Sequence, residues 1–223
     1  MSTISGKPFA SMLLDHGYWS RPFRGTPPCG DGAGWVSGED ESWLLVMDAI
    51  GHGPIAHRIA RLSLDVFKTT LESTQLSEGS VNHVINRLHE TLRLRNLDEQ
   101  AAMNLYHFDH VNSKLTAVAV GNLEAFLISP TDSSSLPSQN GMVGGRLPRT
   151  LNVQTLDLVD NSILAVLSDG IQLANAQKEV PKYVYGPYAN RPLKDSARLI
   201  VEGYHRDHDD ASCALVRINC IKS

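Results

Sequence analysis

The 223-residue chain has only three cysteines, and no two of them stand in a CxxC pair. Cys29, Cys213 and Cys220 therefore indicate neither a disulfide framework nor a zinc knuckle. The sequence also lacks any apolar run close to the roughly 20 residues that a membrane-spanning helix needs. Near its N-terminus it has only a short apolar patch at Met12–Leu14, without the apolar region of a signal peptide. We therefore expect a cytoplasmic protein that does not bind a membrane.

Positive charge is not in excess. Lys plus Arg number 20 and Asp plus Glu number 24, which gives a formal net charge of −4 at pH 7. Such a chain lacks the summed positive field that attracts nucleic acid, so no nucleic-acid partner is expected. Apolar residues make up 42% of the sequence, enough for a packed core. With no internal repeat and no linker, we expect a single domain over residues 1–223.

The hydrophobic pattern predicts strands and helices in an α+β order, without the regular βαβ alternation of Rossmann or TIM folds. Helical spacing of apolar residues predicts one helix from Pro54, a second over Val81 to Arg95 and a third over Asp195 to Arg206. The segment 131–141 is expected to be a surface loop. Strands are expected at 10–15, 35–37, 43–50, 102–108, 115–120, 125–128, 152–158, 163–167 and 213–218.

Aspartates stand at the ends of several of these strands. Asp48 ends a continuously apolar run, Asp169 ends another, Asp209 directly precedes the last strand, and Asp31 stands ahead of the strand at Trp35. Asp-Gly is common in turns, so each residue taken alone is also consistent with a simple turn. Because Asp disfavours strands and is costly to bury unpaired, the set suggests carboxylates that converge at one end of a sheet.

Carboxylate ligands without a competing Cys or His pattern suit Mg²⁺ or Mn²⁺ better than zinc. Two such ions about 3.5–4 Å apart share a bridging carboxylate and activate a water for in-line attack on phosphorus. Several bare carboxylates would repel a phosphoserine dianion, and two divalent cations reverse that sign. The aspartates therefore predict metal-dependent phosphoryl chemistry.

Other patterns do not predict a site. The glycines of residues 30–34 are not followed by a helix, as a dinucleotide fingerprint requires. His205 and His208 lie near a predicted helix end, where histidines commonly favour the helix dipole rather than bind zinc. No G-x-S-x-G motif is present, so acyl transfer is not supported.

Six segments in order give the sequence a likeness to a known family. It resembles the metal-dependent protein phosphatases of the PPM, or type two C, superfamily over about residues 29–218. Within that superfamily it is similar to small stand-alone bacterial serine phosphatases related to the sporulation stage II phosphatase, and more narrowly to the stressosome feedback phosphatase. The segments are Gly30-Asp31, Met47–Pro54, Val120-Gly121-Asn122, Gly141–Gly144, Leu167–Ile171 and Asp209–Ser212.

The resemblance implies an α/β/β/α sandwich, in which two antiparallel sheets pack face to face and helices flank them. It also implies a pair of Mn²⁺ or Mg²⁺ ions. Asp48 would bridge both metals, and the backbone carbonyl of Ala49 would ligate one of them. Asp169 and Asp209 would hold the second metal, and Asp31 would bind at the rim of the first or through water.

The resemblance further implies that His52 contacts the substrate phosphate or acts as general acid, with a helix cap as the alternative. The implied activity is hydrolysis of phosphoserine or phosphothreonine on a regulatory protein, of the stressosome scaffold or anti-sigma antagonist type. Two other functions stay open: a catalytically inactive binding module of the same fold, and a hydrolase of small phosphate esters.

Two features depart from the family pattern. Ala49 stands where the family most often has Gly, a change that keeps the carbonyl ligand. About forty residues separate Asp169 from Asp209, fewer than in relatives with a long flap. Substrate selection then falls to another segment. Tyr183–Tyr188 is one candidate, and a solvated loop with aromatic anchors is the alternative reading of it.

Overall fold

The structure, a computed structural model, describes residues 11–73, 81–95 and 99–221. The strands are β1 (Ser11–Arg21), β2 (Asp31–Ser37), β3 (Glu41–Ala49), β4 (Ala101–Asp109), β5 (Lys114–Val120), β6 (Glu124–Ile128), β7 (Ser133–Ser135), β8 (Gln154–Asp157), β9 (Ser162–Leu167) and β10 (Ala211–Ile221). The helices are α1 (Pro54–Ser73), α2 (Val81–Arg95), α3 (Ala176–Glu179), α4 (Pro181–Val184) and α5 (Leu193–Tyr204), with short 3₁₀ turns η1 (Phe23–Gly25) and η3 (Gly186–Tyr188).

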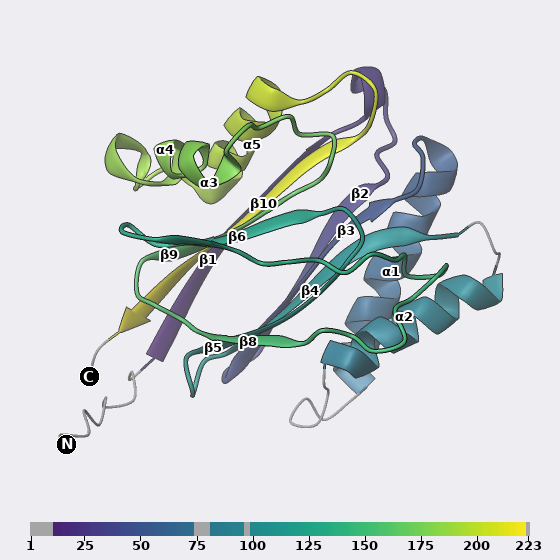
Figure 1. Cartoon of the computed structure of the whole chain (residues 1–223), viewed down its shortest axis with the longest axis horizontal. Coiled ribbons are helices and arrows are strands. Elements are labelled where there is room, and N and C mark those ends of the chain that lie inside the picture. The colour runs from purple at the N-terminus through teal and green to yellow at the C-terminus, as the bar shows by residue number, and fades with distance from the viewer. Residues whose placement is uncertain (1–10, 74–80, 96–98, 222–223) are drawn as a thin grey trace.

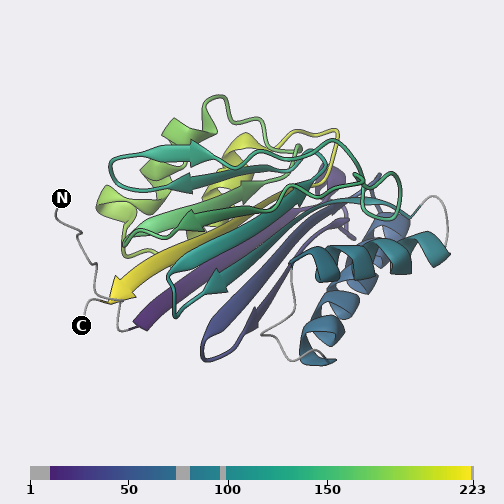
Figure 2. The same ribbon diagram turned by 60° about the horizontal axis from the view of Figure 1, so that its bottom comes forward.

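The strands form two antiparallel sheets of five strands each, which pack face to face (Figure 1). The first sheet has the order β1-β10-β9-β6-β7 and the second has the order β2-β3-β4-β5-β8. Helices α1 and α2 contact the second sheet, and α5 contacts β1 and β10 of the first. Figure 2 shows the strands between the blue helices α1 and α2 and the green helices of the C-terminal half. The predicted α/β/β/α sandwich is confirmed.

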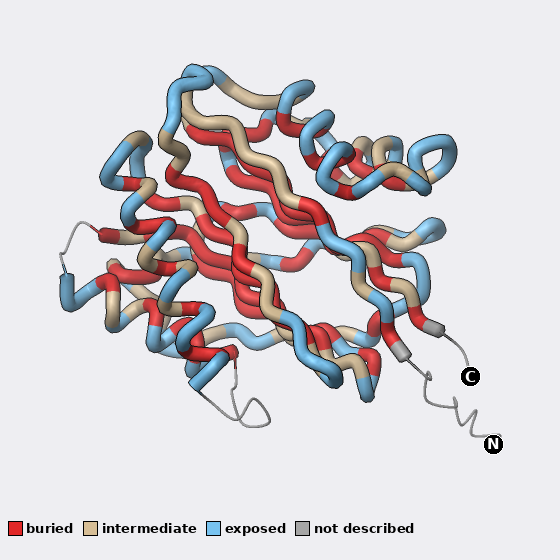
Figure 3. The backbone as a smooth tube through the Cα atoms, turned by 180° about the vertical axis from the view of Figure 1, so that it is seen from behind, coloured by how far each residue is buried: buried red, intermediate tan, exposed pale blue. Residues whose placement is uncertain are grey.

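Strand β3 is apolar almost throughout because both of its faces are buried. Side chains alternate across a strand, so Leu45 and Met47 face the helices while Leu44 and Val46 face the other sheet. On the helix side, Phe67 of α1 joins the same buried cluster as Leu45 and Met47. Figure 3 shows buried residues along the strands of both sheets. Burial on both faces removes the usual apolar–polar alternation and leaves a continuous apolar run.

Helix α5 lies unusually close to β1. A Cβ atom added at Gly17 would lie 2.1 Å from the backbone nitrogen of Lys194, at the start of the helix. Only glycine permits that approach, so Gly17 interrupts the apolar pattern of the strand for a packing reason. The strand was predicted to end at Asp15 but continues to Arg21, and its predicted first residue, Ala10, lies outside the described residues.

Two further details differ from the sequence-based expectations. Strand β2 begins at Asp31, so this aspartate lies inside the strand rather than ahead of it. Ser133–Ser135, expected in a surface loop, forms strand β7 at the edge of the first sheet and pairs with β6. Its three serines carry no apolar alternation that would mark a strand, and its pairing with β6 is through the backbone. Among the helices in the described ranges, none has the length and apolar character needed to cross a membrane.

Candidate active site

Two of the predicted metal ligands face each other across neighbouring strands. The antiparallel register of β2 and β3 places Asp31 directly opposite Asp48. Side chains directly opposite in such a pair have Cβ atoms about 4.5–5.5 Å apart. Asp48 has the same parity as Leu44 and Val46, so both carboxylates lie on the face that packs against the other sheet. Asp31 is only 6% exposed.

The other two aspartates come from the first sheet. Asp169 follows β9 and Asp209 precedes β10, and these strands are antiparallel neighbours, so both residues lie at the same end of that sheet. The pairing continues past the strand ends, because the Ser168 N–H donates to the Ser212 carbonyl at 3.1 Å and the Ser212 N–H donates to Ser168 Oγ at 2.8 Å. The two pairs of aspartates therefore reach one region from opposite sheets.

The charges of these carboxylates act on one another. Burial raises the pKa of Asp48, and the nearby charges of Asp31, Asp169 and Asp209 raise it further. Burial also raises the pKa of Asp31, and the charge of Asp210 adds to that effect. The pKa of Asp209 is raised by burial and by Asp169 and Asp210. The structure thus brings together carboxylates that repel one another in their ionised form.

This arrangement has the chemistry of a divalent cation site. Both carboxylate oxygens of Asp31 are buried and neither accepts a hydrogen bond of normal geometry, although the hydroxyls of Ser212 and Ser168 favour its charged form. A buried carboxylate without partners is costly, and a cation would both pair it and remove the repulsion. Within the described ranges, no group of three or more His, Cys, Asp or Glu side chains is arranged to hold a metal as it stands. The donor set fits Mg²⁺ or Mn²⁺, and its role in metal binding stays a prediction.

Ala49 is the last residue of β3 and is buried. Its N–H donates to the Gly30 carbonyl at 3.4 Å, and it pairs with Ala101 in the sheet. This fixes the backbone directly after Asp48. Its predicted carbonyl ligand therefore belongs to the same strand end as the predicted bridging carboxylate.

Asp210 has a different role from its neighbour Asp209, and the sequence did not separate the two. Asp210 is 2% exposed, and its carboxylate accepts the N–H groups of Phe23 and Gly30, each at 2.6 Å. These bonds tie the segment between β1 and β2 to the start of β10. Charge-assisted bonds of this kind are stronger than neutral ones. The parity of β10 was the available signal, since Asp210 continues the series of Ala214, Val216 and Ile218, which face the other sheet.

Asn122 is a site residue that sequence reasoning did not assign. Its Nδ2 donates to Asp169 Oδ2 at 2.6 Å, so it orients that carboxylate. The preceding Gly121 has φ +108°, and a Cβ there would lie 2.7 Å from the Cα of Ala102. Ala102 is the cross-strand partner of Asp48. The Gly121-Asn122 turn therefore packs beside one aspartate and bonds to another, and its Gly-Asn sequence was the available signal.

His52 lies in an exposed turn between two glycines with φ near +80°. Its ring stacks on Phe23, with centroids 4.2 Å apart and an interplanar angle of 24°. Because the Phe23 N–H bonds to Asp210, this stack places His52 at the rim of the aspartate cluster. Within the described part of the chain its ring makes no hydrogen bond, so the structure does not show it capping α1.

The tyrosine segment lies away from the cluster. Tyr185 donates its hydroxyl to the carbonyls of Ile128, at 3.0 Å, and Asn161, at 2.8 Å. Asn161 precedes β9, whereas Asp169 follows it, so Tyr185 anchors the opposite end of that strand. The segment forms α4 and η3, with Tyr185 as an aromatic anchor, and its role in substrate selection stays a prediction.

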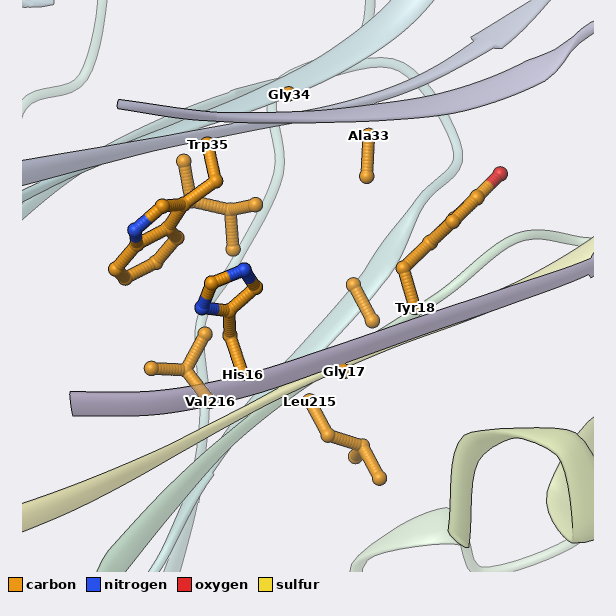
Figure 4. A pocket seen from close by; sticks show the side chains of 10 residues that line it. His16, Gly17, Tyr18, Ala33, Gly34, Trp35, Leu215 and Val216 are labelled. Atoms are coloured by element: carbon orange, nitrogen blue, oxygen red, sulfur yellow. The ribbon is translucent and has the colours of Figure 1, made fainter. Parts of the chain in front are cut away.

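A small cavity of about 160 Å³ opens between β1 and β2 (Figure 4). His16 stacks on Trp35 at one end, with ring centroids 4.4 Å apart, and Tyr18 directs its hydroxyl away from them. Its other lining residues are apolar, and none of the four predicted aspartate ligands lines it. The cavity is therefore a packing feature of the sheet interface rather than the candidate active site.

Comparison with known proteins agrees with this description. RsbX in complex with magnesium has a TM-score of 0.73 and 16% identity, covering 94% of this chain and 96% of that chain. The PP2C phosphatase domain of SpoIIE from Bacillus subtilis, with a fragment of its regulatory domain, has a TM-score of 0.74 and 20% identity, covering 96% of this chain and 65% of that chain. A chain solved in work on the bacterial stressosome as a modular system adapted to control secondary messenger signaling has a TM-score of 0.77 and 25% identity, covering 92% and 100%.

No curated protein matches the sequence. The family model of stage II sporulation protein E (SpoIIE) matches residues 38–219, which include β3, the Gly121-Asn122 turn and the ends of β9 and β10. The match covers most of the chain and coincides with the part of the fold that carries the aspartates. The chain therefore belongs to the stage II sporulation protein E family, within the PPM, or type two C, superfamily of bacterial phosphatases.

Proposed function

We propose that the protein is a Mn²⁺- or Mg²⁺-dependent protein phosphatase that acts in the cytoplasm. Its substrate would be phosphoserine or phosphothreonine on a regulatory protein of a stressosome or partner-switching pathway. The observation that carries this proposal is the meeting of Asp31, Asp48, Asp169 and Asp209 at the ends of two facing sheets. Family membership supports the reaction class, and the likeness to RsbX and to the stressosome-related chain supports the pathway.

Bound cations would lower the pKa of an attacking water and neutralise charge on the phosphoryl oxygens. The chain's own carboxylates would hold these cations. The charges of Asp31, Asp169 and Asp209 all act on Asp48, so Asp48 is within reach of carboxylates from both sheets. Asn122 holds Asp169 in one orientation, and Asp210 fixes the segment that carries Phe23. Asp169 is exposed, so a phosphorylated side chain of another protein has access to this end of the sandwich.

The proposal is tested by phosphate release from a phosphoserine peptide with Mn²⁺, with Mg²⁺ and with a chelator. We expect turnover that depends on the cation and stops in the chelator. An inactive binding module would release no phosphate from the peptide or from a small aryl phosphate. A hydrolase of small esters would show a much higher kcat/KM on the aryl phosphate than on the peptide. Either result would contradict the proposed function.

We further propose that His52 is the general acid for the leaving serine oxygen. A serine alkoxide is a poor leaving group and needs a proton, whereas an aryl phosphate releases a stable phenolate without one. His52→Gln is therefore expected to lower kcat on the phosphoserine peptide by about 10²-fold, within the usual range for acid–base catalysis. On the aryl phosphate the same variant is expected to change kcat by less than about threefold.

The matched control is His57→Gln, because His57 lies in the first turn of α1 and bonds through Nδ1 to the Cys29 carbonyl at 3.0 Å. It tests whether loss of any histidine near this segment reproduces the effect. Equal losses on both substrates for His52→Gln would show that the residue binds or positions the phosphate rather than donating a proton.

A further inference from the structure

A groove lined by two arginines opens on the loop between β7 and β8. It has a volume of about 720 Å³, and we call it the arginine groove; its lining residues are Asn140, Gly141, Arg146, Leu147, Pro148 and Arg149. Both arginines are exposed, and no acidic residue lines the groove. Across the described ranges, neither guanidinium makes a hydrogen bond or an ion pair. Two cations therefore face solvent without partners, although the chain as a whole carries a net charge of −4.

The loop holds these arginines in place. The Met142 N–H donates to the Arg146 carbonyl at 3.0 Å, and Leu147, between the arginines, packs against the core under α1 and α2. Gln139 holds the residues that follow Arg149. Its side chain donates to the Thr150 carbonyl at 3.0 Å and accepts the Asn152 N–H at 2.5 Å. A surface held this way loses little backbone entropy when a partner binds.

The groove adjoins the aspartate cluster. The Gly121 N–H donates to the Gln139 carbonyl at 2.9 Å, and a Cβ at Gly121 would lie 3.6 Å from the Gly141 carbonyl oxygen. Gly121 packs on Ala102, the cross-strand neighbour of Asp48, and the next residue, Asn122, bonds to Asp169. One wall of the groove therefore touches the turn that orients a predicted metal ligand.

We propose that the arginine groove binds an acidic stretch of the phosphoprotein substrate, close in sequence to its phosphorylated residue. This inference rests on the proposed function for the identity of the substrate, and it adds the chemistry by which that substrate is chosen. The net negative charge of the chain disfavours an acidic partner in general, so a docking site for one needs local positive charge, which the two guanidinium groups of the groove supply. Arginine suits this role because its planar donors match carboxylates.

The test compares three substrates in the presence of Mn²⁺: a phosphoserine peptide flanked by glutamates, the same peptide with glutamines in their place, and a small aryl phosphate. For the double variant Arg146→Gln/Arg149→Gln we expect KM on the glutamate peptide to rise about tenfold, with kcat unchanged. A tenfold rise is of the size expected for losing two solvent-exposed ion pairs. KM on the glutamine peptide and turnover of the aryl phosphate are expected to stay within about twofold of the parent protein.

The matched control is Lys194→Gln/Arg198→Gln. It removes two exposed cations of α5 that lie over the ring of Trp19, a residue of β1 in the other sheet. It should leave all three substrates unaffected. Equal KM changes on the two peptides, or none, would overturn the inference. So would an equal change in the control.

Binding is measured separately, so that failure of the groove and failure of the phosphatase activity are distinguishable. Fluorescence anisotropy with the unphosphorylated, labelled glutamate peptide needs no catalysis. We expect weaker binding by the groove variant than by the parent protein and a further weakening with salt. If the protein hydrolysed none of the substrates but the groove variant still bound the peptide more weakly than the parent protein, the inferred role of the groove would be supported and the proposed function would be contradicted. Equal affinity of both proteins for this peptide would reject the groove.

Discussion

Asp48→Asn is expected to lower kcat on the phosphoserine peptide by about 10³-fold or more, because loss of about 4 kcal/mol of transition-state stabilisation corresponds to that factor. The charges of Asp31, Asp169 and Asp209 all act on Asp48, the predicted bridging ligand, so its loss is expected to affect both cations. Asparagine keeps the size of the side chain and removes its charge. Phosphate release at saturating Mn²⁺ measures the effect.

The matched control is Asp65→Asn, an exposed aspartate on α1, which should retain full activity. Asp48→Asn is also expected to raise the unfolding temperature of the metal-free protein, because it removes a carboxyl whose ionised form is disfavoured in the folded state by burial and by the neighbouring carboxylates. Full activity in Asp48→Asn would rule out the proposed mechanism. Lost activity together with a lowered unfolding temperature would indicate a structural role instead.

Addition of Mn²⁺ or Mg²⁺ to metal-free protein is expected to give a large thermal stabilisation. A ligand at 100 times its Kd stabilises the folded state by about 2.7 kcal/mol. For a chain of this length each kcal/mol raises the unfolding temperature by about 2–4 °C, so we expect a rise of about 5–10 °C. A bound cation would stabilise the folded protein for two reasons. It would reduce the repulsion among the aspartates, and it would pair the buried Asp31 oxygens. Differential scanning calorimetry with and without chelator provides the measurement.

Asp48→Asn should lose most of this stabilisation while unfolding in a single transition. The same rise in parent and variant would place the cations elsewhere on the protein and contradict the predicted site. Because the experiment uses no substrate, it tests the metal site independently of the phosphatase activity.

Asp210 and the arginine groove extend the site beyond the four predicted ligands. Asp210 fixes the segment that carries Phe23, whose ring stacks on His52. The Gly121-Asn122 turn connects the aspartates to the groove. The predicted metal ligands and the proposed docking groove would then be held by the same network of backbone hydrogen bonds, without a long flap.

Local pattern was enough for much of the fold. Helix α2 was predicted with its observed bounds, since one apolar stripe at helical spacing specifies a surface helix. The run ending at Asp48 correctly indicated a strand buried on both faces. Strand β7 and the second half of β1 escaped prediction. In each case a long-range contact decides the conformation, namely pairing of polar serines with β6 and the close approach of α5 to Gly17.

By itself, the order of residues determined the α+β succession of strands and helices and placed aspartates at the ends of four strands, because hydrophobic period and strand-end chemistry are local properties of a chain. The α/β/β/α layering was implied by the resemblance to the phosphatase family rather than by these local patterns. Only the tertiary structure decided that Asp31 faces Asp48, that Asp210 turns inward to bind backbone N–H groups, and that a loop with two exposed arginines lies beside the Gly121-Asn122 turn. Those relations depend on strand register and on how two sheets meet. Both are set by contacts between residues far apart in sequence, which no local pattern encodes.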